Sequence, residues 1–156
     1  MAQTRKGIPE GFHSVAPYLI VKDAASAIEF YKKAFGAIEL FRWADPNGVI
    51  RHGEIRIGDT PIMLVDEPKE FPEMRSIQTL GSSPIHLHFY VEDADATIKQ
   101  AIAAGAQQLM PPETKSDGER RGGILDPFGF TWWIATQVED ISREALQKRL
   151  ATPVRE

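Results

Sequence analysis

The feature that most constrains the fold of this chain is a pattern that occurs twice along it. Val21-Lys22-Asp23-Ala24 is matched by Val91-Glu92-Asp93-Ala94, at an offset of 70 residues (93 − 23 = 70). Each copy follows a short strand pattern and opens a helical pattern, which ends at Gly36 in the first copy and at Gly105 in the second. Three further strand patterns follow each helix. The repeat therefore predicts two units with the same order of strand, helix and three strands.

The chain divides into five segments around this repeat. Its length of 156 residues suits one structural domain, and the stretch between the copies is rich in Pro, Glu and Ser, as linkers are. We expect a lead-in at 1–11, a first βαβββ module at 12–66, a linker at 67–84, a second module at 85–137 and a C-terminal helix and tail at 138–156. The predicted fold class is α+β, with the helices and strands of both modules in one domain.

The first strand of the second copy carries polar side chains on one face. In extended conformation, residues 85–91 place His86, His88 and Tyr90 on that face and apolar side chains on the other. Asp93 then follows, and it is suited to capping the helix that begins at Ala94. We expect the apolar face to pack against helices and the polar face to line a pocket.

Composition excludes several classes of function. The net charge of −4 and the pI of about 5.6 argue against a nucleic-acid partner. The absence of cysteine rules out disulfides, thiolate metal sites and a cysteine nucleophile. No apolar run reaches the roughly 18 residues of a membrane span, and the first residues lack the apolar core of a signal peptide. We expect a cytoplasmic protein with no membrane partner.

Six segments in order resemble one known family, the vicinal-oxygen-chelate superfamily of glyoxalase I, bleomycin-resistance proteins and extradiol dioxygenases, and within it the PhnB-like branch. They are Pro17 to Asp23, Phe30 to Ala37, His52 to Asp59, Tyr90 to Asp95, Asp126 to Gly129 and Val138 to Ser142, and they extend over nearly the whole chain. The resemblance implies that the two modules form a cup-shaped, incompletely closed β-barrel with helices outside. It also implies a homodimer.

Metal-using members of this family place four ligands in the cup, and the resemblance aligns these with Ala16, Met63, His86 and Trp133. Alanine has no donor atom, and a tryptophan indole can only donate a hydrogen bond. A methionine thioether is a poor ligand for hard divalent ions. We therefore expect no metal cofactor, and His86 is the only candidate metal ligand among the four.

The residues point to a small-molecule ligand held by aromatic and polar side chains. The candidate ligand-binding residues are Tyr18, His52, Met63, His86, His88, Tyr90 and Trp133. Rings of this kind bind aromatic and cationic molecules by stacking and cation-π contacts. Trp132 and Trp133 must lie on opposite faces of their strand, so one belongs to the core and, by the resemblance, Trp133 belongs to the pocket. The predicted function is binding of the bleomycin-resistance type, without a catalytic metal.

Three alternatives stay open. The first is a metal-dependent lyase, isomerase or dioxygenase that uses a divalent metal held by His86 or His88 together with Glu54. The second is a metal-free enzyme in which Glu54, the candidate catalytic residue, or a histidine acts as general base. In the third, the histidines of the second module are satisfied by backbone or water and have no chemical role. The identity of the ligand is not specified by the residues.

Overall fold

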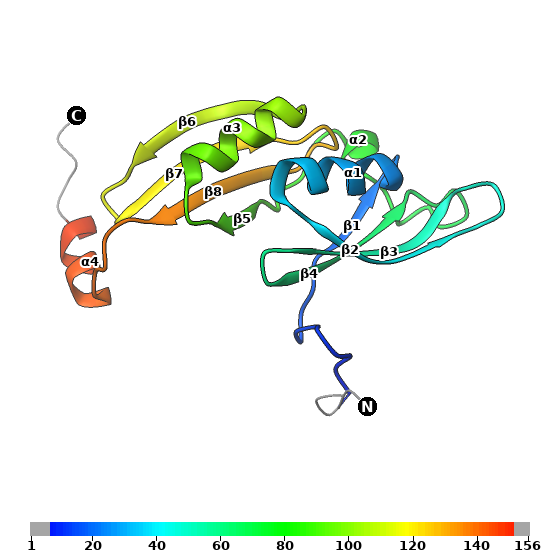
Figure 1. The fold of residues 1–156 in the computed structure, drawn as a ribbon, viewed down its shortest axis with the longest axis horizontal. Helices are drawn as coiled ribbons and strands as arrows, with labels where there is room; N and C mark the ends of the chain where they lie inside the picture. Colours follow the sequence, from blue (N-terminus) through cyan, green and yellow to red (C-terminus); the bar gives the residue numbers. More distant parts are fainter. Residues whose placement is uncertain (1–6, 152–156) are drawn as a thin grey trace. The chain divides into compact units, whose positions relative to one another are not determined.

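The computed structural model describes residues 7–151, which form two compact units (Figure 1). Unit 1 spans the chain up to Pro84 and also contains the turn Pro127–Phe130. Unit 2 comprises Ile85–Asp126 and the chain from Thr131 onward. Within the described residues, no helix is both long and apolar enough to cross a membrane.

Unit 1 contains a four-stranded sheet with one long helix. Its elements are β1 (Tyr18–Val21), α1 (Ala24–Phe35), β2 (Ile38–Ala44), β3 (Ile50–Ile57), β4 (Thr60–Asp66) and the short helix α2 (Ile77–Leu80). The strand order is β1-β4-β3-β2, with β1 parallel to β4 and the other neighbours antiparallel. The first module is therefore a βαβββ unit, as predicted.

Unit 2 repeats this topology. Its elements are β5 (Leu87–Tyr90), α3 (Ala94–Ala104), β6 (Gln107–Thr114), β7 (Glu119–Leu125), β8 (Thr131–Gln137) and α4 (Arg143–Ala151). The strand order is β5-β8-β7-β6, again with one parallel pair. The predicted α+β class with two βαβββ modules is confirmed, whereas the way in which the two sheets would complete a cup stays a prediction.

The repeat extends to the residues that begin the two main helices. The carboxylate of Asp23 accepts a hydrogen bond from the backbone N–H of Ser26 at 3.0 Å, and Asp93 accepts one from Ala96 at the same distance. Both bonds satisfy an N–H group that has no partner inside the helix. The Val-x-Asp-Ala pattern therefore predicted the two helix starts correctly.

The same offset of 70 residues relates the strand registers. Tyr18 pairs with Met63 in unit 1, and His88 pairs with Trp133 in unit 2. Each of these residues was a ligand-binding candidate. Each pair therefore places two of the candidates side by side, at equivalent positions of the two parallel strand pairs.

The helices bury one face of each sheet and leave the other to polar and aromatic side chains. In unit 1, Ile28 of α1 and Leu64 of β4 are fully buried. In unit 2, Ile98 of α3 and Trp132 of β8 are almost completely buried, which confirms Trp132 as the core tryptophan. Since side chains alternate along a strand, Trp133 lies on the opposite face.

Two segments differ from the sequence-based expectation. The predicted linker 67–84 contains α2, which is capped by the buried Ser76, and the Ser76 hydroxyl donates to the Glu67 carboxylate. A helix of four residues is too short to leave a periodic pattern in the sequence. The charged run at 119–121, whose composition suits a solvated loop, opens strand β7. The cause is the sheet register, which pairs Glu119 with Gln137 of β8.

Candidate functional site

Unit 1 contains a pocket of about 390 Å³ with aromatic walls. Tyr18 comes from β1, Trp43 from β2, and Phe71 and Met74 from the segment between β4 and α2. The complete lining is Tyr18, Trp43, Asp45, Arg51, Val65, Pro68, Glu70, Phe71 and Met74. The volume lies within the range of roughly 300–1,000 Å³ that is usual for small-molecule sites.

The charged side chains of this pocket form a linked trio. The guanidinium of Arg51 contacts the carboxylate of Asp45 at 3.1 Å and that of Glu70 at 2.5 Å. Burial opposes ionisation of Asp45, but the N–H groups of Val49 and Asn47, together with Arg51, outweigh it and hold its pKa below the usual value. The trio therefore contains two carboxylates and one guanidinium.

A second polar pair lies on the open face of the same sheet. Nε2 of His52 is 2.9 Å from Oε1 of Glu54, and both side chains are half-buried. The imidazole stacks with the ring of Tyr18 at a centroid distance of 6.4 Å and lies 6.2 Å from the ring of Phe41. Glu54 pairs with Met63, the strand neighbour of Tyr18. Unit 1 therefore brings together its four candidates, Tyr18, His52, Glu54 and Met63.

In unit 2, His86 and Trp133 are joined by a hydrogen bond. The indole Nε1–H of Trp133 donates to Nδ1 of His86 at 3.0 Å. A nitrogen that accepts a hydrogen bond carries no proton, so a neutral His86 ring carries its proton on Nε2. The backbone of Gly123 makes room for the indole, because a Cβ at this position would lie 2.8 Å from the ring.

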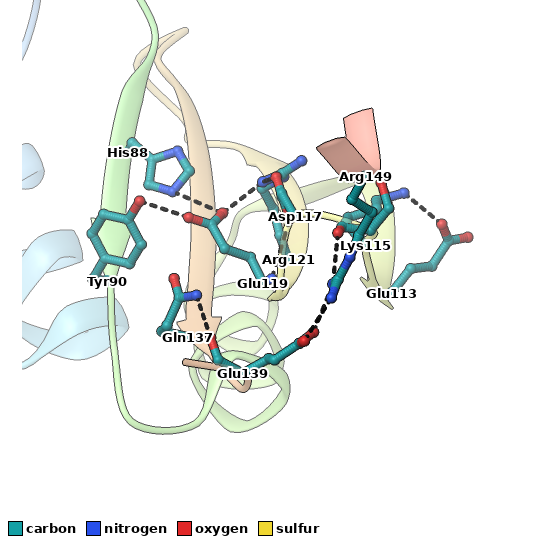
Figure 2. Close-up of polar contacts among 11 residues, drawn as sticks. His88, Tyr90, Glu113, Lys115, Asp117, Glu119, Arg121, Gln137, Glu139 and Arg149 are labelled. Atoms are coloured by element: carbon teal, nitrogen blue, oxygen red, sulfur yellow. Dashed lines mark hydrogen bonds and ion pairs between the residues drawn. The ribbon is translucent and has the colours of Figure 1, made fainter. Parts of the chain in front are cut away.

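His88 and Tyr90 have a different partner, the carboxylate of Glu119 (Figure 2). The Tyr90 hydroxyl donates to Oε1 at 2.6 Å, and Nε2 of His88 lies 3.6 Å from Oε2. Arg121 donates to Oε2 at 2.5 Å. Glu119 is only 8% exposed, and its hydrogen bond raises the pKa of Tyr90. His86 and His88, which alternation places on one face, therefore lie beside different residues, Trp133 and Glu119.

Glu119 is the residue of this cluster that sequence reasoning missed. Alternation along β7 places Glu119 and Arg121 on the open face, while Arg120 turns to the helix side and pairs with Asp95 of α3. Ala135 lies between Tyr90 and Arg121 in the sheet register, and its small side chain leaves space for the contact above it. The sequence offered no clear signal, because residues 119–123 are three charged residues followed by two glycines and do not alternate between polar and apolar.

Every lining residue of the unit 1 pocket except Tyr18 was also missed, including the large apolar side chains of Trp43, Phe71 and Met74. Phe71 and Met74 lie in the predicted linker, where apolar side chains stand out against a polar background. Trp43 lies on β2, where apolar and polar residues alternate only weakly in the sequence. The strand also has register shifts, so its side chains do not follow a strict alternation. An exposed aromatic residue in a polar connecting segment was the signal that could have indicated the pocket.

The donor set at the aligned metal positions of the second module does not fit a metal ion. The Trp133 indole donates its proton and offers no lone pair, and it occupies Nδ1 of His86. Within residues 7–151, no group of three His, Cys, Asp or Glu side chains is arranged to hold a metal ion. Whether a metal binds stays a prediction, and no chemical step is derived through one.

Comparison with known proteins assigns the chain to a family. The model of the Glyoxalase/Bleomycin resistance protein/Dioxygenase superfamily matches residues 11–134. The chain therefore belongs to this superfamily, which confirms the resemblance found in the sequence. Because the superfamily contains enzymes and binding proteins alike, membership defines the fold and leaves the reaction to the site.

Individual relatives agree with this assignment. An uncharacterised protein of Mycobacterium bovis is 36% identical over 141 residues, covering 89% of this chain and 93% of its own. The X-ray structure of a gene product from Arabidopsis thaliana is similar with a TM-score of 0.65 and 27% identity, over 80% of this chain and 98% of that one. A PhnB protein of Bacillus cereus shares the fold, with a TM-score of 0.62 and 15% identity, over 80% of this chain and 99% of the other.

Proposed function

We propose that this protein binds a small aromatic, cationic organic molecule in the pocket of unit 1 and does so without a metal. The observation that carries this proposal is the pocket lining, in which Tyr18, Trp43 and Phe71 surround about 390 Å³ beside two carboxylates. The sequence also predicted an aromatic-lined site, but of its candidate ligand-binding residues only Tyr18 lines this pocket. Trp43 and Phe71 supply the other two rings.

The aromatic rings support the class of ligand. Tyr18, Trp43 and Phe71 are 45%, 58% and 50% exposed, so each has a free surface that water covers in the absence of a ligand. Transfer of such surfaces out of water is favourable, and a ring-to-ring contact adds about 0.5–1.5 kcal/mol. A cation above these rings adds a comparable amount at an exposed site.

The charges of the pocket support a cation over an anion. Asp45 and Glu70 share the single guanidinium of Arg51, so the trio carries one excess negative charge when both carboxylates are ionised. The lowered pKa of Asp45 keeps its carboxylate charged well below neutral pH. A positively charged ligand would offset this charge, whereas an anionic ligand would be repelled.

The donor chemistry of the aligned metal positions supports binding without a metal. His86 has its Nδ1 lone pair engaged by Trp133, and Ala16 has no donor atom. The metal-dependent lyase, isomerase or dioxygenase alternative would need Glu54 together with His86 or His88, whereas the contact made by Glu54 is to His52. The homodimer and the cytoplasmic location remain expectations from the sequence.

Equilibrium binding of benzyltrimethylammonium tests the proposal, with isothermal titration calorimetry as the readout, because the test variant removes the tryptophan of the pocket. We expect binding that persists in excess chelator and that weakens at least about tenfold, or about 1.4 kcal/mol, in Trp43→Ala. Phe41→Ala is the matched control, since Phe41 is an equally exposed ring on the same strand outside the pocket lining. Equal affinity in wild type and Trp43→Ala, or binding that needs an added metal, would contradict the proposal.

A further inference from the structure

We propose that His52 is a general base for a molecule bound beside it, and that Glu54 positions the imidazole and does not itself take the proton. This inference rests on the proposed pocket of unit 1, because it assigns a chemical activity to its border. The sequence left two candidates for a general base open, Glu54 or a histidine, and the geometry favours the histidine.

The distance between the two side chains fixes the protons. A carboxylate only accepts hydrogen bonds, so the contact of 2.9 Å between Oε1 of Glu54 and the ring of His52 requires a proton on Nε2. In the neutral ring, Nδ1 then carries the lone pair. Glu54 therefore selects the tautomer in which Nδ1 is the basic atom, which is the role that a carboxylate plays beside a catalytic histidine.

Two aromatic rings hold the imidazole in place. Tyr18 stacks with it at an interplanar angle of 29°, and Phe41 lies on the neighbouring strand at a tilt of 46°. His52 is 27% exposed, so part of the ring is accessible. A base must be held within hydrogen-bond reach of the proton that it removes, and packing by rings restricts the ring to one orientation.

The register of the sheet places His52 at the border of the pocket. Its cross-strand partner is Trp43, and its stacking partner is Tyr18. Both of these residues line the pocket. His52 itself is not part of the pocket lining, so a ligand that contacts the two rings reaches the imidazole at the edge of the pocket.

Among residues 7–151, a second imidazole–carboxylate approach is less suited to this role. Nε2 of His88 lies 3.6 Å from Glu119, beyond the range of a hydrogen bond. Glu119 already accepts from Tyr90 and Arg121. Its carboxylate is therefore engaged elsewhere, whereas Glu54 is directed at His52.

The chemical step is a simple proton transfer. Nδ1 takes a proton from a C–H or O–H group of the ligand, and the electron pair stays on the ligand or expels a leaving group. The resulting imidazolium keeps its Nε2–H bond to Glu54, whose negative charge stabilises it. No oxidant, reductant or second reactant is needed.

The test uses 5-nitrobenzisoxazole, a small planar aromatic probe with one acidic C–H group. Removal of this proton breaks the N–O bond and gives a coloured nitrophenolate that carries a nitrile group. The rate of colour formation therefore measures proton removal by the base. We expect a rate above that of free imidazole at equal concentration. His52→Gln should lower the rate by about 10²-fold, the lower range for a positioned general base.

Matched variants separate the roles of the two residues. His13→Gln removes an exposed histidine before β1 and should leave the rate unchanged. Glu54→Gln keeps a hydrogen-bond acceptor but removes the charge, and it should lower kcat while KM stays the same. A variant that only loosened the fold would change both, and circular dichroism spectra establish that each variant is folded.

The results distinguish this inference from the proposed function. If the protein binds benzyltrimethylammonium but eliminates 5-nitrobenzisoxazole no faster than free imidazole does, the general-base role of His52 is wrong and the binding site stands. A rate that survives in His52→Gln but disappears in Glu54→Gln would overturn the inference in favour of the carboxylate. If the wild-type protein does not bind benzyltrimethylammonium, the proposed function itself is wrong.

Discussion

The indole N–H of Trp133 donates a hydrogen bond to Nδ1 of His86 over 3.0 Å, and the two rings lie with their centroids 6.0 Å apart. The residue that most resembles a metal ligand in the sequence is therefore bonded to a neighbour that cannot bind a metal. The imidazole keeps one free polar atom, Nε2, and in the neutral ring this atom is a donor.

Nitrogen-15 NMR spectra of the imidazoles test this arrangement. At a pH at which His86 is neutral, we expect its proton on Nε2 and none on Nδ1. Trp133→Phe removes the donor, so the variant should show a shifted Nδ1 resonance and a mixture of tautomers. The resonances of His13, which lies on a separate segment, should not move. A wild-type His86 with its proton on Nδ1 would contradict the assigned bond.

The bond between Tyr90 and Glu119 predicts behaviour at alkaline pH. Glu119 raises the pKa of Tyr90 above the ordinary value of about 10. The folded pKa exceeds the unfolded one, so the stabilisation is fully present below about pH 10 and is lost as the pH rises through the folded value. In an ultraviolet titration of phenolate, Glu119→Gln should lower the pKa of Tyr90.

Urea unfolding provides the second readout for this pair. Tyr90→Phe removes the hydroxyl, so the difference in unfolding free energy from wild type should be present near neutral pH and shrink above about pH 10. Tyr90 is 61% exposed, and solvent screening keeps the difference below about 1 kcal/mol. A difference that grows with pH would contradict the assigned direction.

The sequence predicted the fold well because the fold depends on local signals that occur twice. Asp23 and Asp93 cap helices, and Gly36 and Gly105 end them, through contacts within a few residues. The faces of β5 also followed from alternation, since His88 and Tyr90 lie together on the open face. Such patterns require no knowledge of distant parts of the chain.

The site was less predictable because its contacts join residues that are far apart in the sequence. Glu119 meets Tyr90 over a separation of 29 residues, and Arg51 meets Glu70 over 19 residues. Neither contact leaves a periodic trace. The contact between His52 and Glu54 was closer to prediction, since they lie two apart on one strand, but the sequence could not show which ring nitrogen of His52 faces the carboxylate.

Two strand glycines with different surroundings give an informative pair of substitutions. Gly123 lies in β7 opposite Trp133 of β8, and Gly53 lies in β3 opposite Leu64 of β4. A Cβ at Gly123 would lie 2.8 Å from the Trp133 ring, whereas at Gly53 the nearest atoms are 3.4 Å away. Gly123→Ala should therefore destabilise the protein by about 1–3 kcal/mol, as overpacking does, and Gly53→Ala by less.

Urea unfolding of both variants measures this difference, and the His86 resonances report its cause. A displaced indole in Gly123→Ala should also break the bond to Nδ1, so its spectrum should resemble that of Trp133→Phe. Equal stability of the two glycine variants would show that the indole moves aside at no cost.

The caps of the two main helices predict similar losses of stability when either aspartate is replaced. For Asp23 they also predict a stability that depends on pH. The Ser26 backbone N–H and hydroxyl hold the pKa of Asp23 below its usual value. The folded pKa is the lower one, so the stabilisation is present above the unfolded value of about 3.9 and is lost as the pH falls through the folded value. Asp23→Ala should cost about 1 kcal/mol near neutral pH, and Asp93→Ala a similar amount.

Urea unfolding near pH 7 and near pH 2 measures the loss for Asp23→Ala, which should shrink at the lower pH because a protonated carboxyl is a weaker acceptor. Asp23→Asn keeps an acceptor oxygen without the charge, and it should retain most of the stability at both pH values. An Asp23→Ala loss that stays the same at both pH values would mean that the charge of the cap contributes nothing.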